Sequence, residues 1–75
     1  MDRENVIRMA QDIGWIVKPC YDPTRIAVQC GIAPDANERM RVTAEGAVLI
    51  VDDGYYWQIG TTQEVAAAIR ARGQG

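Results

Sequence analysis

The residue types that most often carry out enzymatic chemistry are scarce in this sequence of 75 residues. Histidine, serine and phenylalanine are all absent. Histidine is the commonest general base near neutral pH and a common metal ligand, and the usual hydrolase triad needs serine together with histidine. Two cysteines and scattered carboxylates are too few ligands for a closed zinc site. We therefore predict that the protein is not an enzyme and that it holds no metal or other cofactor.

The adjacent carboxylates Asp52 and Asp53 precede Gly54. Neighbouring residues on a strand point to opposite faces, so these two do not form a ready acid/base pair. A calcium loop would need more oxygen ligands than this segment carries. Aspartate beside glycine is typical of a tight turn, and that is the structure we expect here.

The two cysteines, Cys20 and Cys30, do not form a C-x-x-C motif. If residues 15–20 and 25–30 form a hairpin that turns at residues 22–24, Cys20 faces Ile26 and Cys30 lies near Ile16. The two cysteines are then about 13 Å apart along the sheet. A disulfide needs Cα atoms within about 7 Å, so we predict two buried free thiols.

Residues 47–59 predict a β-hairpin, because an aliphatic run joins an aromatic run through an Asp-Gly pair. Tyr55, Trp57 and Ile59 share one face of the second arm, which we expect to pack under the helices. Tyr56 lies on the other face and should be half exposed. Residues 48–51 are apolar on both faces, which indicates a central strand or a face that a partner covers.

Helices are predicted at both ends of the chain. Asp2 is a suitable N-cap for a helix over residues 3–13, which Gly14 would end. Thr61 and Glu64 have the spacing of a capping box that starts a second helix, and Gly73 would end it.

Further strands are expected beside the central hairpin. Residues 15–20 and 25–30 suit one hairpin, and residues 39–44 alternate charged and apolar side chains before a turn at residues 45–46. The sequence predicts a single α+β domain over residues 1–75. Its small antiparallel sheet of four to five strands would be flanked by an N-terminal and a C-terminal helix.

The charge pattern suggests a contact surface. The chain carries a net charge of −2, yet no basic residue occurs from Val42 through Ile69. A local negative potential attracts a basic surface, and tyrosines are favoured anchors in protein interfaces. We predict a protein-binding surface at this end of the domain, made of Glu45, Asp52, Asp53, Tyr55 and Tyr56.

Two alternatives remain open. Four arginines could contact the phosphates of a nucleic acid or nucleotide, although the acidic composition and the missing phosphate-binding motifs favour a protein partner. An edge strand could instead pair across a two-fold axis in a homodimer. The four arginines are Arg39, Arg41, Arg70 and Arg72.

No apolar run is long enough to span a membrane and the N-terminus lacks a secretion signal, so we expect a cytoplasmic protein.

The opening segment, DRENVIRMAQDIGW over residues 2–15, resembles the start of many short, uncharacterised proteins encoded by tailed bacteriophages. This resemblance implies a setting, the host cell cytoplasm, in which such proteins often bind host machinery. The targets include transcription complexes and antiviral systems such as CRISPR effectors. The combined prediction is a small phage-type binding module that docks on a host protein and inhibits it.

Overall fold

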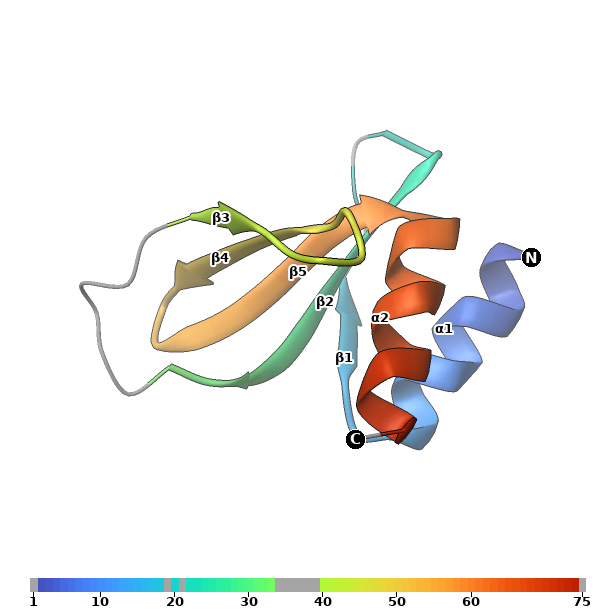
Figure 1. Cartoon of the computed structure of the whole chain (residues 1–75), viewed down its shortest axis with the longest axis horizontal. Coiled ribbons are helices and arrows are strands. Elements are labelled where there is room, and N and C mark those ends of the chain that lie inside the picture. Colours follow the sequence, from blue (N-terminus) through green and yellow to red (C-terminus); the bar gives the residue numbers. More distant parts are fainter. Residues whose placement is uncertain (1, 19, 21, 34–39, 75) are drawn as a thin grey trace.

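The computed structural model describes residues 2–18, 20, 22–33 and 40–74, and shows a five-stranded antiparallel sheet with two helices. The strand order is β1-β2-β5-β4-β3. Both helices pack at the β1–β2 end of the sheet, while β3, β4 and the tip of β5 extend away from them (Figure 1). The predicted α+β class is confirmed. The elements are α1 (Arg3–Asp12), β1 (Ile16–Lys18), β2 (Arg25–Ile32), β3 (Arg41–Val42), β4 (Val48–Asp52), β5 (Tyr55–Thr61) and α2 (Thr62–Gln74).

The helix starts follow the predicted caps. Asp2 Oδ1 accepts a hydrogen bond from the Glu4 backbone N–H at 3.3 Å at the start of α1. At α2 the Thr61 N–H donates to Glu64 Oε1 at 2.9 Å, and the Glu64 N–H donates to Thr61 Oγ1 at 3.2 Å, which completes the capping box. Gly73 does not stop α2, which runs on to Gln74; a glycine near a helix end costs little and does not force termination.

The central hairpin turns through Asp53 and Gly54, whose φ angles are +53° and +82°. Asp52 pairs with Tyr55, so the loop has two residues, and positive φ at both is the preferred geometry for such a hairpin. The preceding turn runs from Thr43 to Gly46, whose N–H donates to the Thr43 carbonyl at 3.0 Å. The strand predicted over residues 39–44 is shorter, Arg41–Val42, and residues 34–39 lie outside the described part of the chain.

Two glycines allow the chain to close around Glu64. A Cβ at Gly46 would lie 2.9 Å from Glu64 Oε2, and one at Gly60 would lie 3.0 Å from Glu64 Oε1 and 3.2 Å from its Cβ. A larger residue at either position would require the Glu64 side chain to shift. The β3–β4 turn, the end of β5 and the start of α2 are therefore held together at one point.

The hydrophobic core lies between the helices and the β1–β2–β5 side of the sheet. Ile26 and Val28 of β2 face the helices and are fully buried. Burying an aliphatic side chain of this size stabilises the fold by about 1.5–3 kcal/mol, so this contact positions the sheet. The buried partners of these residues are Val6, Ala10, Trp15, Val65, Ala66, Ala68 and Ile69.

The prediction that Tyr55, Trp57 and Ile59 pack under the helices is wrong. Gln58 pairs with Val28, which faces the helices. Because side chains alternate along a strand, Trp57 points to the opposite face of the sheet. Moving a strand by one residue exchanges the faces to which all its side chains point. In β5 the polar residue Gln58 is therefore on the helix side.

Candidate functional site

The sheet face turned away from the helices is largely apolar, and we call it the open face. The pairing registers place Trp57 and Ile59 of β5 beside Val48 and Ile50 of β4 on this face, all of them half-buried. Of the residues that the structure describes, neither helix lies over it. The remaining members are Ile16, Lys18, Arg25, Ala27, Gln29, Ile32, Val42, Asp52 and Tyr55.

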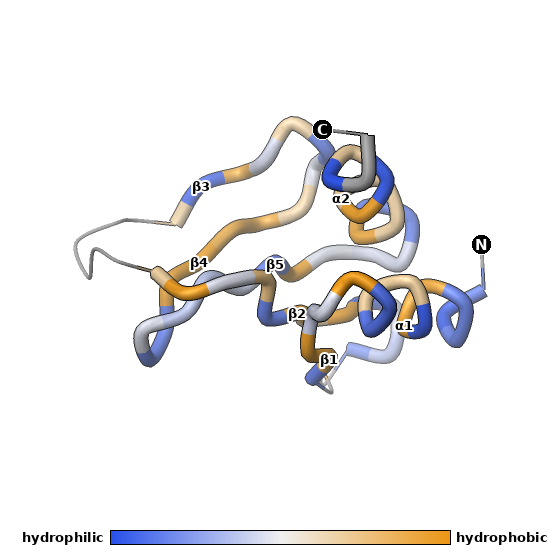
Figure 2. The backbone as a smooth tube through the Cα atoms, turned by 90° about the horizontal axis from the view of Figure 1, so that it is seen from below, coloured by the Kyte–Doolittle hydropathy of each residue, from blue (hydrophilic) through white to orange (hydrophobic). Residues whose placement is uncertain are grey.

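Large apolar side chains exposed to solvent gather on the open face. Val42, Ile16 and Ile32 are 70%, 51% and 76% exposed. Tyr55 lies on the same face, and exposed Met40 directly precedes β3. Figure 2 shows hydrophobic residues along β4 as well as in the helices. Exposed apolar side chains on one face of a sheet typically mark an interaction surface.

Trp57 is held in place at the centre of the open face. Its indole Nε1–H donates to the backbone carbonyl of Asp52 at 3.2 Å. Asp52 lies two residues beyond Ile50, the residue paired with Trp57, so the ring is anchored along β4 towards the hairpin tip. An aromatic side chain fixed before binding loses little conformational entropy when a partner covers it.

The five predicted contact residues do not form one surface. Asp52, Asp53, Tyr55 and Tyr56 lie together at the tip of the β4–β5 hairpin. Glu45 lies in the β3–β4 turn at the other end of β4, about 17 Å away at the rise of a strand. At the tip, Tyr55 and Asp52 belong to the open face, and Tyr56 lies on the helix side.

The helix side of the tip holds Cys30. Its thiol lies 3.6 Å from the Tyr56 carbonyl oxygen and 3.9 Å from Gln58 Nε2. Burial raises the pKa of the Cys30 thiol above its ordinary value, because desolvation disfavours the thiolate. Such a thiol is a weak nucleophile, which suits packing better than chemistry.

Both cysteines are free, as predicted, but they are half-buried rather than buried. The predicted pairing of β1 with β2 is wrong by one residue, because Lys18 pairs with Ala27 and Ile16 with Gln29. The turn spans Asp22 to Arg25, whose N–H donates to the Asp22 carbonyl at 3.1 Å. Eight residues separate Lys18 from its partner Ala27, one fewer than the predicted register requires.

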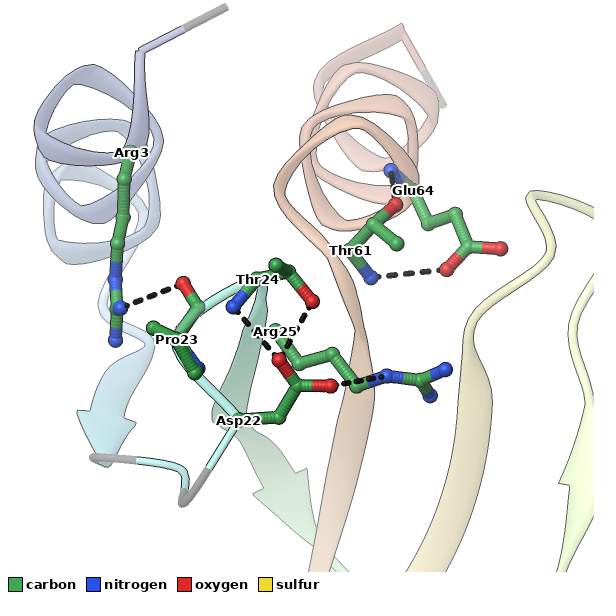
Figure 3. A network of polar contacts seen from close by, with 7 residues as sticks. All are labelled: Arg3, Asp22, Pro23, Thr24, Arg25, Thr61 and Glu64. Atoms are coloured by element: carbon green, nitrogen blue, oxygen red, sulfur yellow. Dashed lines mark hydrogen bonds and ion pairs between the residues drawn. The ribbon is translucent and has the colours of Figure 1, made fainter.

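Asp22 organises the end of the open face away from the hairpin tip (Figure 3). Its Oδ1 accepts hydrogen bonds from Thr24 N at 2.9 Å and Thr24 Oγ1 at 2.6 Å, and these bonds lower the pKa of Asp22. Oδ2 pairs with Arg25 Nε at 3.3 Å, with both side chains about half exposed. An exposed pair of this kind contributes little, so Arg25 can turn towards another carboxylate.

The arginines of the nucleic-acid alternative are spread out. Arg41 lies on edge strand β3, whereas Arg70 and Arg72 lie near the end of α2, on the far side of the molecule (Figure 1). The Arg72 guanidinium lies 5.8 Å from the centre of the Trp15 ring, and Arg39 falls outside the described residues. Of the described residues, Arg41 does not share a surface with Arg70 and Arg72.

Within residues 2–18, 20, 22–33 and 40–74, no group of three or more His, Cys, Asp or Glu side chains could hold a metal ion. No helix in this part of the chain is long and apolar enough to cross a membrane.

Comparison with protein-family models, with curated proteins and with solved structures finds no match.

The importance of the open face was only partly visible in the sequence. The apolar character of residues 48–51 on both faces was the one signal for it, since one of those faces had to lie away from the helices. The exposure of Ile16, Ile32 and Val42 depends on pairing between distant segments and carried no local signal.

Proposed function

We propose that the protein is a protein-binding module that lays its open face on another polypeptide. The main support is that the exposed large apolar side chains of the described residues lie on or beside one face of the sheet. At the centre of this face Trp57 is held by its hydrogen bond to the Asp52 carbonyl. Aromatic and aliphatic anchors at the centre of a patch supply most of the binding energy in protein interfaces.

The acidic hairpin tip forms part of the rim of this surface. Asp52 lies at the edge of the open face and Asp53 in the adjoining turn, where they attract basic groups and set the orientation of a partner. The resemblance of residues 2–15 to phage proteins favours a host protein as the partner and inhibition as the outcome. The tip supports this proposal as a contributor to the contact, with the apolar face at its centre.

Affinity capture from a bacterial host lysate tests the proposal with two matched double variants. Ile16→Lys with Val42→Lys places two charges on exposed positions of the open face. Gln11→Lys with Gln63→Lys places the same charges on exposed positions of the two helices. We expect wild type and the helix variant to enrich the same protein, and the open-face variant to lose it by about tenfold or more.

A third variant separates the face from the tip. Asp53→Asn removes a tip charge and keeps the turn, because asparagine tolerates a φ near the observed +53°. We expect it to retain the partner, with slower association at low salt. Equal capture by all variants, or loss only with Asp53→Asn, contradicts the open face as the contact surface.

A further inference from the structure

We propose that the open face also binds a second copy of this chain, forming a two-sheet sandwich across a two-fold axis. This inference rests on the proposed function, because it names one occupant for the same surface. The axis lies in the plane between the sheets and runs across the strands. The β5 strands of the two copies then run in opposite directions, crossed at the angle of about 30° that packed sheets adopt.

The charges on the open face are self-complementary. Lys18 and Arg25 lie towards one end of the strands, and Asp52 and Asp53 lie at the other end. A two-fold axis across the strands brings the positive end of one copy against the negative end of the other, twice per dimer. Asp22 pairs with Arg25 at the positive end, so that end carries a net charge of +1 against −2 at the hairpin tip, and the two ends still attract each other.

The size of the face fits a weak, specific dimer. From β1 to β3 it measures about 19 Å at the usual strand spacing, and from Tyr55 to Arg25, which pairs with Thr61, about 20 Å at the usual rise. Two such faces of about 380 Å² each cover roughly 800 Å² in total, which is the size of a weak, transient contact. The expected Kd is therefore micromolar or weaker.

The shape of the face also suits self-packing. Ala27 is the smallest side chain at its centre and pairs with Ile59, beside Trp57. In the crossed arrangement Trp57 of one copy lies near Ala27 of the other. Large residues packed against small ones fill the space between two sheets.

Sedimentation velocity over about 0.5 to 500 µM, which brackets a micromolar Kd, tests this with two charge-reversal variants. Wild type should shift from 8.3 kDa towards twice that mass. Arg25→Glu and Asp52→Lys each create like-charge contacts at both symmetric positions, so each alone should dimerise about tenfold more weakly or worse. Mixed in equal amounts, the two variants should form a heterodimer with nearly the wild-type Kd, because every contact is again between opposite charges.

The mixture separates interface effects from folding defects, since a misfolded variant cannot restore a dimer. Wild type that stays monomeric at the highest concentration overturns the inference, and so does a mixture that stays as weak as its components. If wild type is monomeric while the open-face lysines still abolish capture of another protein, the proposed function stands and the second copy is excluded. If wild type dimerises and the lysines leave capture unchanged, the second copy stands as the occupant of the open face and the proposed function is excluded.

Discussion

A matched pair of isoleucine substitutions tests whether the two faces of the sheet differ as described. Ile26 faces the helices and is fully buried, whereas Ile16 lies on the open face and is 51% exposed. Replacing a buried isoleucine by valine typically costs 0.5–1.5 kcal/mol. We expect Ile26→Val to lower the free energy of unfolding by about 1 kcal/mol, and Ile16→Val to change it by less than about half as much.

The expected shifts are measurable because the domain is small. With a core that supplies about 3–5 kcal/mol, a loss of 1 kcal/mol lowers the Tm by roughly 6 °C for a chain of this length. The urea midpoint falls by about 1 M if the m value is near 1 kcal/mol/M. Urea unfolding followed by tryptophan fluorescence at about 0.5 µM, below the expected Kd of the dimer, keeps the protein largely monomeric and separates the two variants.

Equal losses at the two positions would refute the assignment of the faces. A larger loss at Ile16 would mean that something covers the open face in the monomer. At high concentration the dimer should add stability to the wild type, and the cost of Ile16→Val should then grow while that of Ile26→Val stays constant.

Three further predictions concern the scaffold. Glu64→Ala removes half of the capping box and should cost about 1 kcal/mol in urea unfolding, whereas Gln63→Ala, an exposed neighbour, should be nearly neutral. Gly54→Ala should cost about 1 kcal/mol or more because its φ is +82°, whereas Gly31→Ala, which also has open space around it, should be tolerated; a similar cost at both would remove the turn strain as the cause. Cys30 should react with a disulfide reagent more slowly in the folded chain than in urea, as site-resolved mass spectrometry can show, because burial raises its pKa. Equal reaction rates of Cys30 in the folded chain and in urea would contradict this prediction. The contribution of the raised pKa to the free energy of unfolding is present below the pKa of the unfolded thiol, and it falls as pH rises towards the pKa of the folded thiol.

Local signals in the sequence predicted much of the fold. The Asp53-Gly54 turn, the capping box at Thr61 and the helix after Asp2 all lie where their residue types require them. Each depends on interactions within a few residues, and these are set by backbone preferences that the sequence carries directly. With alternating strands between them, these features were sufficient to predict the α+β class.

The facing of the strands could not be predicted in the same way. Which side of β5 meets the helices depends on its pairing with β2, about thirty residues earlier in the chain. Composition indicated the wrong side, because Trp57 is more apolar than Gln58 and yet lies on the open face. The register of β1 against β2 likewise differs by one residue from the register predicted from the sequence.

The candidate site was predicted in part. The hairpin tip with Asp52, Asp53, Tyr55 and Tyr56 is one locality, but Glu45 lies at the opposite end of β4. The count of acidic residues along the sequence does not show at which end of a strand each one lies. Glu45 and Asp52 are therefore close in sequence but lie at opposite ends of β4. The apolar face between them emerged only from the registers.

The two tryptophans provide the most direct test that the open face is the contact surface, because they lie on opposite sides of the sheet. Trp57 is on the open face, whereas Trp15 is buried among the helices. The indole N–H resonances of the two residues, assigned with Trp57→Phe, can be followed by NMR while a captured partner or more of the protein itself is added. We expect the Trp57 resonance to move with binding and the Trp15 resonance to stay in place. Movement of Trp15 alone, or binding that leaves Trp57 unchanged, would contradict it.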